Sequence, residues 1–222
     1  MQILTWNLFH GRAVPPAGRS LRDEFAGALA GWDWDVALLQ EVPPWWPDSL
    51  ARACGAQQRT ALTSRNSLLP LRRALAERWP DVMKSNGGGA NAILVRGPAI
   101  TEHRVQRLRR WPERRVVHAV RLAGGPWVGN LHASVHSPRR AEADARRAGA
   151  ALLEWAGDAS AVLGGDFNVR TPSVEGFEWA GGHGVDHVLC RGLRSTGPGV
   201  RPVRGVLSDH EPVLVELSAQ VG

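Results

Sequence analysis

The sequence predicts an α/β protein in which two β-sheets pack face to face, with helices on the outside. Two observations carry this prediction. Apolar strand patterns alternate with helical patterns at both ends of the chain, and hairpin-forming strands follow one another in the middle. At 222 residues the chain is long enough for one large core, so we expect a single domain over residues 1–222. No apolar run is long enough to predict a transmembrane segment.

The N-terminal half alternates between strands and helices. Residues 2–8 form an apolar, alternating run that predicts a strand ending at Asn7, and Ser20 is placed to cap a helix over residues 21–30. Residues 35–40 read as a buried strand that two following prolines terminate. The other elements predicted here are a short helix at 47–54, a helix at 67–79, a turn at 86–89 and a strand at 91–95.

The C-terminal half begins with hairpin strands and then returns to alternation. Hairpin strands are predicted at 101–108, 115–122 and 127–132. Ser137 at the N-cap and Pro138 at the first helical position begin the clearest helix. Its buried stripe is predicted to be Ala141, Ala145, Ala148, Leu152 and Trp155. Later strands are predicted at 161–163, 184–190, 201–204 and 212–217, with a glycine-rich loop before the second of them.

The net charge of +6 is compatible with a polyanionic partner. Lys84 is the only lysine, so the positive charge is nearly all arginine, a bias that GC-rich coding also produces. Clustering is more informative than the total. The arginines gathered in one short segment are Arg104, Arg107, Arg109, Arg110, Arg114, Arg115 and Arg121. A solvated hairpin face is the alternative explanation for this cluster.

Cysteine usage and the first residues bear on location. Cys54 and Cys190 are too few for a disulfide framework, which fits a reducing compartment. The first residues lack the basic start and long apolar stretch of a signal peptide. We therefore expect a cytoplasmic protein.

The stretch Val162-Leu163-Gly164-Gly165-Asp166-Phe167-Asn168 carries the first hint of chemistry. If a strand continues through it, Asp166 and Asn168 point to the same side and together suit holding and deprotonating a water. Taken alone, however, the stretch favours a strand that ends in an Asx turn, which is the commoner use of Asp and Asn after a strand. The two glycines allow another backbone or a substrate to approach closely.

Polar residues also occur at the ends of five other predicted strands, which is where open sheets place their sites. Each has an ordinary structural explanation, such as a turn, a surface acid or a core histidine. Six strand ends of this kind in one chain favour a shared site. The residues are Asn7, Glu41, Asn130, His132, Asp166, Asn168, Asp186, His187, Asp209 and His210.

These motifs, taken in order, resemble those of the endonuclease/exonuclease/phosphatase superfamily, which includes DNase I-like nucleases, apurinic endonucleases, Mg-dependent sphingomyelinases and inositol phosphatases. The resemblance spans residues 2–217 and implies a four-layer αββα sandwich of the DNase I-like type. The matching stretches are Thr5-Trp6-Asn7, Gln40-Glu41, Asn130-Leu131-His132, Gly164-Gly165-Asp166-Phe167-Asn168, Val185-Asp186-His187 and Ser208-Asp209-His210-Glu211-Pro212-Val213.

The resemblance implies a divalent-metal site. Glu41 matches the main metal carboxylate of the family, and Asn7 and Asp209 complete or support its ligand shell. Ligands that are all oxygen favour Mg²⁺ or Mn²⁺ over Zn²⁺.

The resemblance also implies the catalytic groups. Asp166 matches the residue proposed to orient or deprotonate the attacking water, and Asn168 would hold water or phosphate. His210 would contact the scissile phosphate, held by a hydrogen bond to Asp186. His132 occupies a phosphate-side or general-acid position. Weaker candidates for substrate contact are His10, Asn91 and Asn130, whereas a structural role is preferred for His187.

The sequence departs from the apurinic endonucleases, because it contains no tyrosine and so lacks the phenol those enzymes place before the strand at 92–96. The chain is also short for the superfamily, so long substrate-binding insertions are expected to be missing.

We expect a monomeric, metal-dependent phosphoesterase whose phosphate-ester substrate is nucleic acid. The arginine cluster could follow a phosphate backbone, and Trp45 and Trp46 could stack on bases or anchor a loop. The alternatives are hydrolysis of a lipid headgroup or small phosphate ester, where the same tryptophans could touch a membrane, and a catalytically silent binding module.

Overall fold

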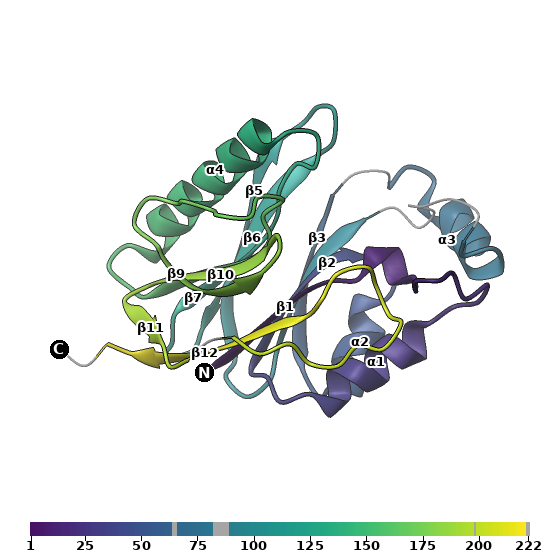
Figure 1. Cartoon of the computed structure of the whole chain (residues 1–222), viewed down its shortest axis with the longest axis horizontal. Coiled ribbons are helices and arrows are strands. Elements are labelled where there is room, and N and C mark those ends of the chain that lie inside the picture. The colour runs from purple at the N-terminus through teal and green to yellow at the C-terminus, as the bar shows by residue number, and fades with distance from the viewer. Residues whose placement is uncertain (64–65, 82–88, 198, 221–222) are drawn as a thin grey trace.

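The computed structural model describes residues 1–63, 66–81, 89–197 and 199–220. In this part of the chain two six-stranded sheets pack face to face, with α1 and α2 on the outer face of one sheet and α4 on that of the other (Figure 1). This arrangement confirms the predicted fold class, a four-layer αββα sandwich. Of the turn predicted at 86–89, residues 86–88 lie outside the described residues.

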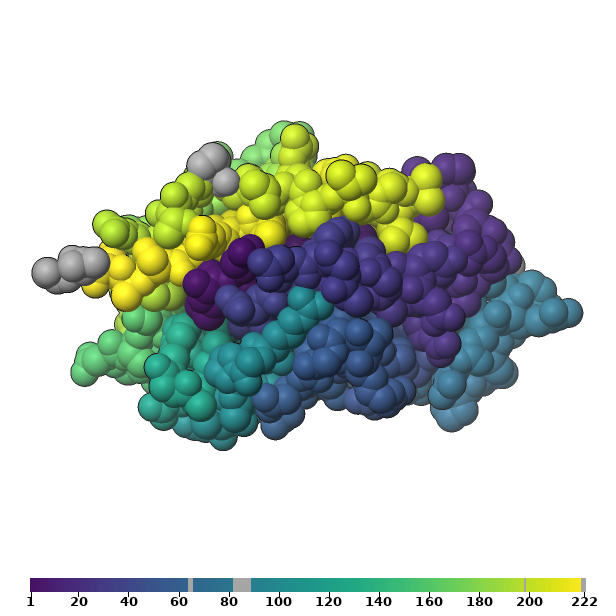
Figure 2. All heavy atoms as spheres, turned by 90° about the horizontal axis from the view of Figure 1, so that it is seen from below, coloured from purple at the N-terminus to yellow at the C-terminus, as the bar shows by residue number. Residues whose placement is uncertain are grey.

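Sheet 1 is mixed. Strand β1 runs parallel to β2 and antiparallel to β12, and all its other pairs are antiparallel. Because β1 lies between β2 and β12, the N-terminal and C-terminal segments lie side by side (Figure 2). In spatial order the strands are β11 (Leu193–Ser195), β12 (Val213–Ala219), β1 (Gln2–Asn7), β2 (Val36–Val42), β4 (Ala90–Val95) and β3 (Gln57–Leu62).

Sheet 2 is also mixed, with one parallel pair between β7 and β8. The predicted hairpin strands form its first half, and β6 and β7 have the predicted bounds. In spatial order the strands are β5 (Ile100–Arg109), β6 (Arg115–Leu122), β7 (Trp127–His132), β8 (Ala161–Asp166), β10 (Asp186–Arg191) and β9 (Glu178–His183).

Alternation along the strands divides the core into three apolar layers. On β1, Leu4 and Trp6 face the helices of sheet 1, whereas Ile3 faces sheet 2. On β8, Leu163 faces α4 and Val162 faces sheet 1. Burial on both faces explains why these strands are apolar almost throughout.

The helices follow from capping and apolar spacing. Helix α4 (Pro138–Ala156) starts as predicted, with Ser137 Oγ accepting a hydrogen bond from the Arg140 N–H, and its alanine stripe packs on sheet 2. The apolar faces of α1 (Arg22–Gly31) and α2 (Pro47–Ala53) cover sheet 1. None of the described helices is long and apolar enough to cross a membrane.

Helix α3 (Leu69–Arg78) differs from the others because none of its residues is buried. It projects from one end of the molecule (Figures 1 and 2). The helical spacing of its leucines therefore does not mark a core face, and Leu71 and Trp79 are more than half exposed.

Several local predictions were wrong. Ser20 does not cap α1, whose N-cap is Leu21 without a side-chain hydrogen bond. Strand β2 continues through Glu41 instead of ending before it. Residues 201–204 form no strand, and the glycine-rich segment taken as a loop contains β9. Strands β3 and β11 were not predicted, because they are edge strands that lack a continuous apolar run.

Candidate active site

Polar side chains from both sheets meet at one edge of the molecule. In sheet 1, Asn7 ends β1 beside Gln40 of the parallel strand β2. In sheet 2, Asp166 ends β8, with His132 of β7 opposite it on one side and Asp186 of β10 on the other. The strand registers alone therefore place these groups next to one another.

Asp166 is the centre of this cluster. Its side chain is almost fully buried and accepts hydrogen bonds from Asn7 Nδ2 at 3.0 Å and from the Asn168 N–H at 3.0 Å. The Nε2 atoms of His132 and His210 lie 3.5 Å and 3.9 Å from Asp166 Oδ2. Burial raises the pKa of Asp166, and the charge of His210 and both hydrogen bonds oppose that rise. Such a carboxylate can orient a water and accept its proton.

The two glycines before Asp166 admit neighbouring parts of the protein. A Cβ on Gly165, whose φ is +141°, would lie 1.9 Å from the backbone oxygen of Leu131 on β7. A Cβ on Gly164 would lie 2.5 Å from Leu38 Cδ1 in the opposite sheet. The two glycines therefore allow strand β7 and sheet 1 to pack closely against the end of β8.

Asn168 does not continue the strand beside Asp166. Strand β8 ends at Asp166, and Asn168 has a left-handed backbone with φ +52°. Its N–H bonds Asp166 Oδ1, so the Asx turn is the geometry present, and its Nδ2 donates to the Ala133 oxygen at 3.0 Å. The two side chains therefore do not face one spot through strand alternation.

The loop before β12 brings two further residues to this edge. Ser208 Oγ donates to the Asn7 backbone oxygen at 2.7 Å and accepts from the His210 N–H at 3.0 Å. Asp209 is largely exposed, and its Oδ1 lies 4.0 Å from His210 Nε2. The loop is thus fastened to β1 next to the candidate metal residues.

The expected hydrogen bond between His210 and Asp186 is present, with 2.7 Å between Nδ1 and Oδ2. Burial disfavours the charged imidazole, but the hydrogen bond and charge of Asp186 outweigh it and raise the pKa of His210 to about 9. Burial also raises the pKa of Asp186 to about 7 against the opposing effect of His210. The proton therefore stays on His210, whose Nε2 faces Asp166.

Glu41 reaches the site through an irregularity in sheet 1. The pairing of β2 with β4 shifts between Leu39 and Val42, and Glu41 has φ +50°. Its carboxylate lies 3.1 Å from His10 Nε2 and 3.8 Å from His132 Nε2. Burial, with a smaller contribution from the Asp166 charge, raises the pKa of Glu41 to about 7.

His132 and Arg115 are buried beside these acids. His132 Nε2 has no hydrogen-bond partner among the described residues, and burial, with a smaller contribution from Arg115, lowers the pKa of His132 well below its usual value. Arg115 donates to Glu113 at 2.6 Å, and its Nε is buried without a hydrogen-bond partner in the described part of the chain. Its charge acts on Glu41, Asp166 and His132. Arg115 was predicted only as one member of the arginine cluster, although its place at the start of an apolar strand signals burial.

The rest of the arginine cluster has divided roles. Arg104 and Arg121 both bind Glu102, and Arg109 binds the fully buried Asp144 at 3.0 Å. Three members are exposed on β5 or the turn after it: Arg107, Arg110 and Arg114.

The two weaker asparagine candidates differ. Asn130 accepts from Gln40 Nε2 at 2.8 Å and donates to the backbone oxygens of Leu39 and Ala92, so bridging the two sheets accounts for it better than a substrate contact. Asn91 lies on β4 near the β2 irregularity, is fully buried, and neither of its side-chain polar atoms has a hydrogen-bond partner among the described residues.

The donor set fits a divalent cation. Glu41, Asp166 and Asp186 are three acids gathered here, and besides the effect of burial the charge of Asp166 raises the pKa of both Glu41 and Asp186, so negative charges lie close together. Ligand atoms of Asp166, Asp186 and His210 lie within 4.8 Å of one another. Asp186 and His210 already form a hydrogen bond with each other. Glu41 on β2 and Asp209, in the loop fastened to β1, are therefore more open to bind a cation.

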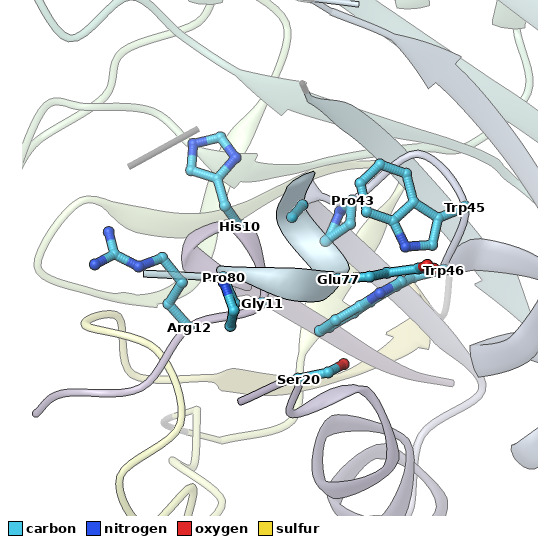
Figure 3. Close-up of a pocket in the computed structure, with 10 residues that line it drawn as sticks. His10, Gly11, Arg12, Ser20, Pro43, Trp45, Trp46, Glu77 and Pro80 are labelled. Atoms are coloured by element: carbon cyan, nitrogen blue, oxygen red, sulfur yellow. The ribbon is translucent and has the colours of Figure 1, made fainter. Parts of the chain in front are cut away.

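A small pocket lies beside His10 and is lined in part by Glu77 of α3 (Figure 3). Trp46, which belongs to the core and packs on Phe25 at 5.7 Å between ring centroids, forms part of its wall. The pocket encloses about 30 Å³, enough for roughly two waters. It is too small for a substrate group, and Trp46 is a loop anchor instead of an exposed stacking surface.

Buried carboxylates and histidines with shifted pKa values at the shared edge of two packed sheets mark a candidate active site. Residues 4–210 match the Endonuclease/Exonuclease/phosphatase family, and the chain belongs to that family of enzymes, which act on phosphate esters. No curated protein sequence matches the chain.

Solved structures share the fold over nearly the whole chain at low sequence identity. An endonuclease/exonuclease/phosphatase from Bacteroides vulgatus has a TM-score of 0.74 at 14% identity, covering 99% of this chain and 98% of that one. A mannosyl-6-phosphatase from Bacteroides thetaiotaomicron has 0.69 at 17%, covering 98% and 99%. The human Nocturnin catalytic domain, solved with a bound sulfate anion, has 0.69 at 16%, covering 99% and 93%.

Proposed function

We propose that this protein is a divalent-metal-dependent nuclease that hydrolyses phosphodiester bonds of DNA or RNA. The observation that carries the proposal is the convergence of polar strand ends from both sheets on the buried carboxylate of Asp166. A phosphodiester is already anionic, so its hydrolysis depends mainly on neutralising charge and positioning the attacking water.

The side chains divide this work. Asp166 orients the water and takes its proton, held by the hydrogen bonds from Asn7 and Asn168. His210, kept protonated by Asp186, donates from Nε2 to a phosphate oxygen as negative charge accumulates there. His132 and Arg115 lie on the other side of Asp166 and bind the phosphate or the leaving group.

Glu41, Asn7 and Asp209 would hold Mg²⁺ or Mn²⁺. Asp166 and Asp209 both raise the pKa of Glu41, so these acids lie within electrostatic reach of one another. When bound, the cation neutralises a phosphate oxygen and stabilises the leaving group. His10 contacts the Glu41 carboxylate and orients it toward this site.

Nucleic acid is favoured over a small ester because of surface charge near the catalytic edge. Arg107 and Arg110 are exposed on the β5–β6 hairpin, and the same hairpin leads into Arg115, whose charge reaches the catalytic acids. A run of exposed arginines next to the reacting phosphate suits neighbouring phosphates of a polynucleotide. Burial of Trp46 removes one reason to consider a membrane-associated substrate.

The test is a hydrolysis panel with Mg²⁺ or Mn²⁺ over single- and double-stranded DNA, RNA, sphingomyelin, inositol phosphates, a sugar phosphate and a chromogenic diester. We expect cleavage of nucleic acid that EDTA abolishes and added metal restores. Asp166→Asn and His210→Ala should abolish it, whereas Asp158→Asn and His136→Ala, at exposed positions, should not.

Salt separates the two substrate classes. If the exposed arginines neutralise backbone phosphates, KM for nucleic acid should rise steeply with ionic strength, and hydrolysis of a small ester should respond far less. Cleavage of a small phosphate ester alone would identify a phosphatase or phosphodiesterase. Full activity of both catalytic variants would refute the assigned site.

A further inference from the structure

A larger pocket lies against the β9–β10 hairpin and has no role in the chemistry described above. Its volume is about 570 Å³, within the range of small-molecule sites. The lining residues are Arg170, Thr171, Pro172, Trp179, Gly182, His183, Gly184 and His187.

Trp179 offers a flat aromatic surface held in one orientation. Its side chain is 59% exposed, yet its Nε1 donates to His187 Nδ1 at 3.2 Å. His187 is itself buried, and its Nε2 lies 3.0 Å from the Val169 backbone oxygen. Because Nδ1 accepts from the indole, Nε2 carries the proton and donates to that oxygen. The indole is thus fixed at its polar edge while its face stays open.

Glycine makes this arrangement possible. A Cβ on Gly182 would lie 2.2 Å from His187 Nδ1, where the tryptophan hydrogen bond is made. Gly184 takes φ +62° in the turn that joins the two strands. The glycine-rich segment therefore seats His187 and presents Trp179.

The charge of the lining restricts the ligand. None of the described residues that line the pocket is acidic, and the ionisable ones among them are Arg170, His183 and His187. Arg170 is exposed and has no ion-pair partner among the described residues. A stacking surface beside an unpaired guanidinium suits a planar aromatic group that carries negative charge. A nucleobase with its phosphate is such a group.

The pocket and the catalytic site share two chain segments. Arg170 follows two residues after Asn168, and His187 follows Asp186 directly. Successive residues of a strand point to opposite faces, so the pocket lies across β10 from the Asp186–His210 pair. A polynucleotide that passes over the turn at Gly184 would connect them.

We propose that this pocket is a nucleobase-binding site that holds a nucleotide flanking the scissile phosphate. The proposal rests on the nuclease function proposed above. Binding of a base in this pocket would make the enzyme prefer certain cleavage positions, although the pocket does not contact the scissile bond.

The test compares Trp179→Ala, Trp179→Phe and Arg170→Gln with wild type in the full-length protein. Loss of one stacking contact should raise KM for an oligonucleotide about tenfold in Trp179→Ala and shift the cleavage positions. Trp179→Phe keeps an aromatic face and should retain most of the affinity. Hydrolysis of a chromogenic diester without a base should be unchanged in all three, which shows that the fold and catalytic site are intact.

Titration with AMP, followed by tryptophan fluorescence, tests whether the pocket binds the base of a free nucleotide or a base of the polynucleotide substrate. Quenching lost in Trp179→Ala, with unchanged oligonucleotide KM, would still support a base site but assign it to a free nucleotide. Active wild type with unchanged oligonucleotide KM, cleavage pattern and AMP response in Trp179→Ala would overturn the inference and leave the nuclease function standing. Failure of wild type to cleave any nucleic acid would overturn the function, and AMP binding would then decide the pocket separately.

Discussion

Replacing His118 should change how stability depends on pH. His118 lies on β6, is fully buried, and has Nδ1 3.3 Å from Nε2 of His103, which in turn is near the charge of Arg59. Its Nε2 has no hydrogen-bond partner among the described residues. Burial, with a smaller contribution from His103, lowers the pKa of His118 from 6.5 to about 3. The native state therefore requires the neutral imidazole.

The sign and size of the effect follow from linkage. As pH falls below about 6.5 the unfolded chain binds a proton that the native His118 refuses until about pH 3. Above the pKa of His118 in the unfolded chain the folded protein keeps its full stability. As the pH falls from that value toward the pKa in the folded state, stability is lost progressively. Between about pH 7.5 and pH 5 this single group accounts for a loss of roughly 2 kcal/mol.

Urea unfolding at both pH values measures this directly. His118→Leu should lose about 2 kcal/mol less than wild type on acidification, because leucine has no proton to bind. At neutral pH its stability should stay within roughly 1 kcal/mol of wild type, since the substitution removes an unpaired polar atom. His136→Leu, at an exposed position, controls for removal of a histidine. Equal acid sensitivity in His118→Leu and wild type would refute the reasoning.

Three further predictions concern the site and its support. Gly165→Ala should cost about 3 kcal/mol or more, because its Cβ would meet the Leu131 oxygen, whereas Gly27→Ala, in open space on α1, should be tolerated; urea unfolding compares them. Arg115→Gln should lower kcat/KM about tenfold or more by removing a buried positive charge beside the catalytic acids, and steady-state kinetics would show it. Asp144→Ala should destabilise by about 3–5 kcal/mol, since it leaves a partly buried arginine unpaired, and thermal unfolding beside Asp144→Asn would separate charge from size.

The fold could be read from the sequence where burial is two-sided or capping is local. The bounds of two strands, at residues 115–122 and 127–132, were predicted correctly because both faces of each strand are largely buried. Ser137 and the following proline gave α4 by a contact within one turn. In contrast, β3 and β9 are edge strands that are stabilised by pairing with a neighbouring strand, and their own sequences do not predict that pairing.

The site could be predicted as a set of residues but not as a geometry. Strand ends at Asn7 and Asp166 follow from apolar runs, so their meeting at one edge could be expected. The positive φ of Glu41 depends on tertiary contacts and was not predicted, whereas the Asx turn at Asn168 is a local hydrogen bond that the stretch itself favoured. The start of an apolar strand signals the burial of Arg115, but the arginine cluster was interpreted as a whole, and charge clusters are usually solvated.

The roles proposed for the two sheets explain why some buried polar residues take no direct part in the reaction. Sheet 1 supplies Asn7 and the candidate metal carboxylate, and sheet 2 supplies Asp166, so the site exists only if the sheets keep their relative position. Gln40 and Asn130 join them by hydrogen bonds of 2.8–3.0 Å inside the buried interface between the sheets. Apolar packing alone would tolerate small slips between the sheets, whereas directional bonds would not. By holding the sheets in one relative position the bridge supports the 3.0 Å contact between Asn7 and Asp166, and substrate specificity is left to the loops and hairpins at the edge.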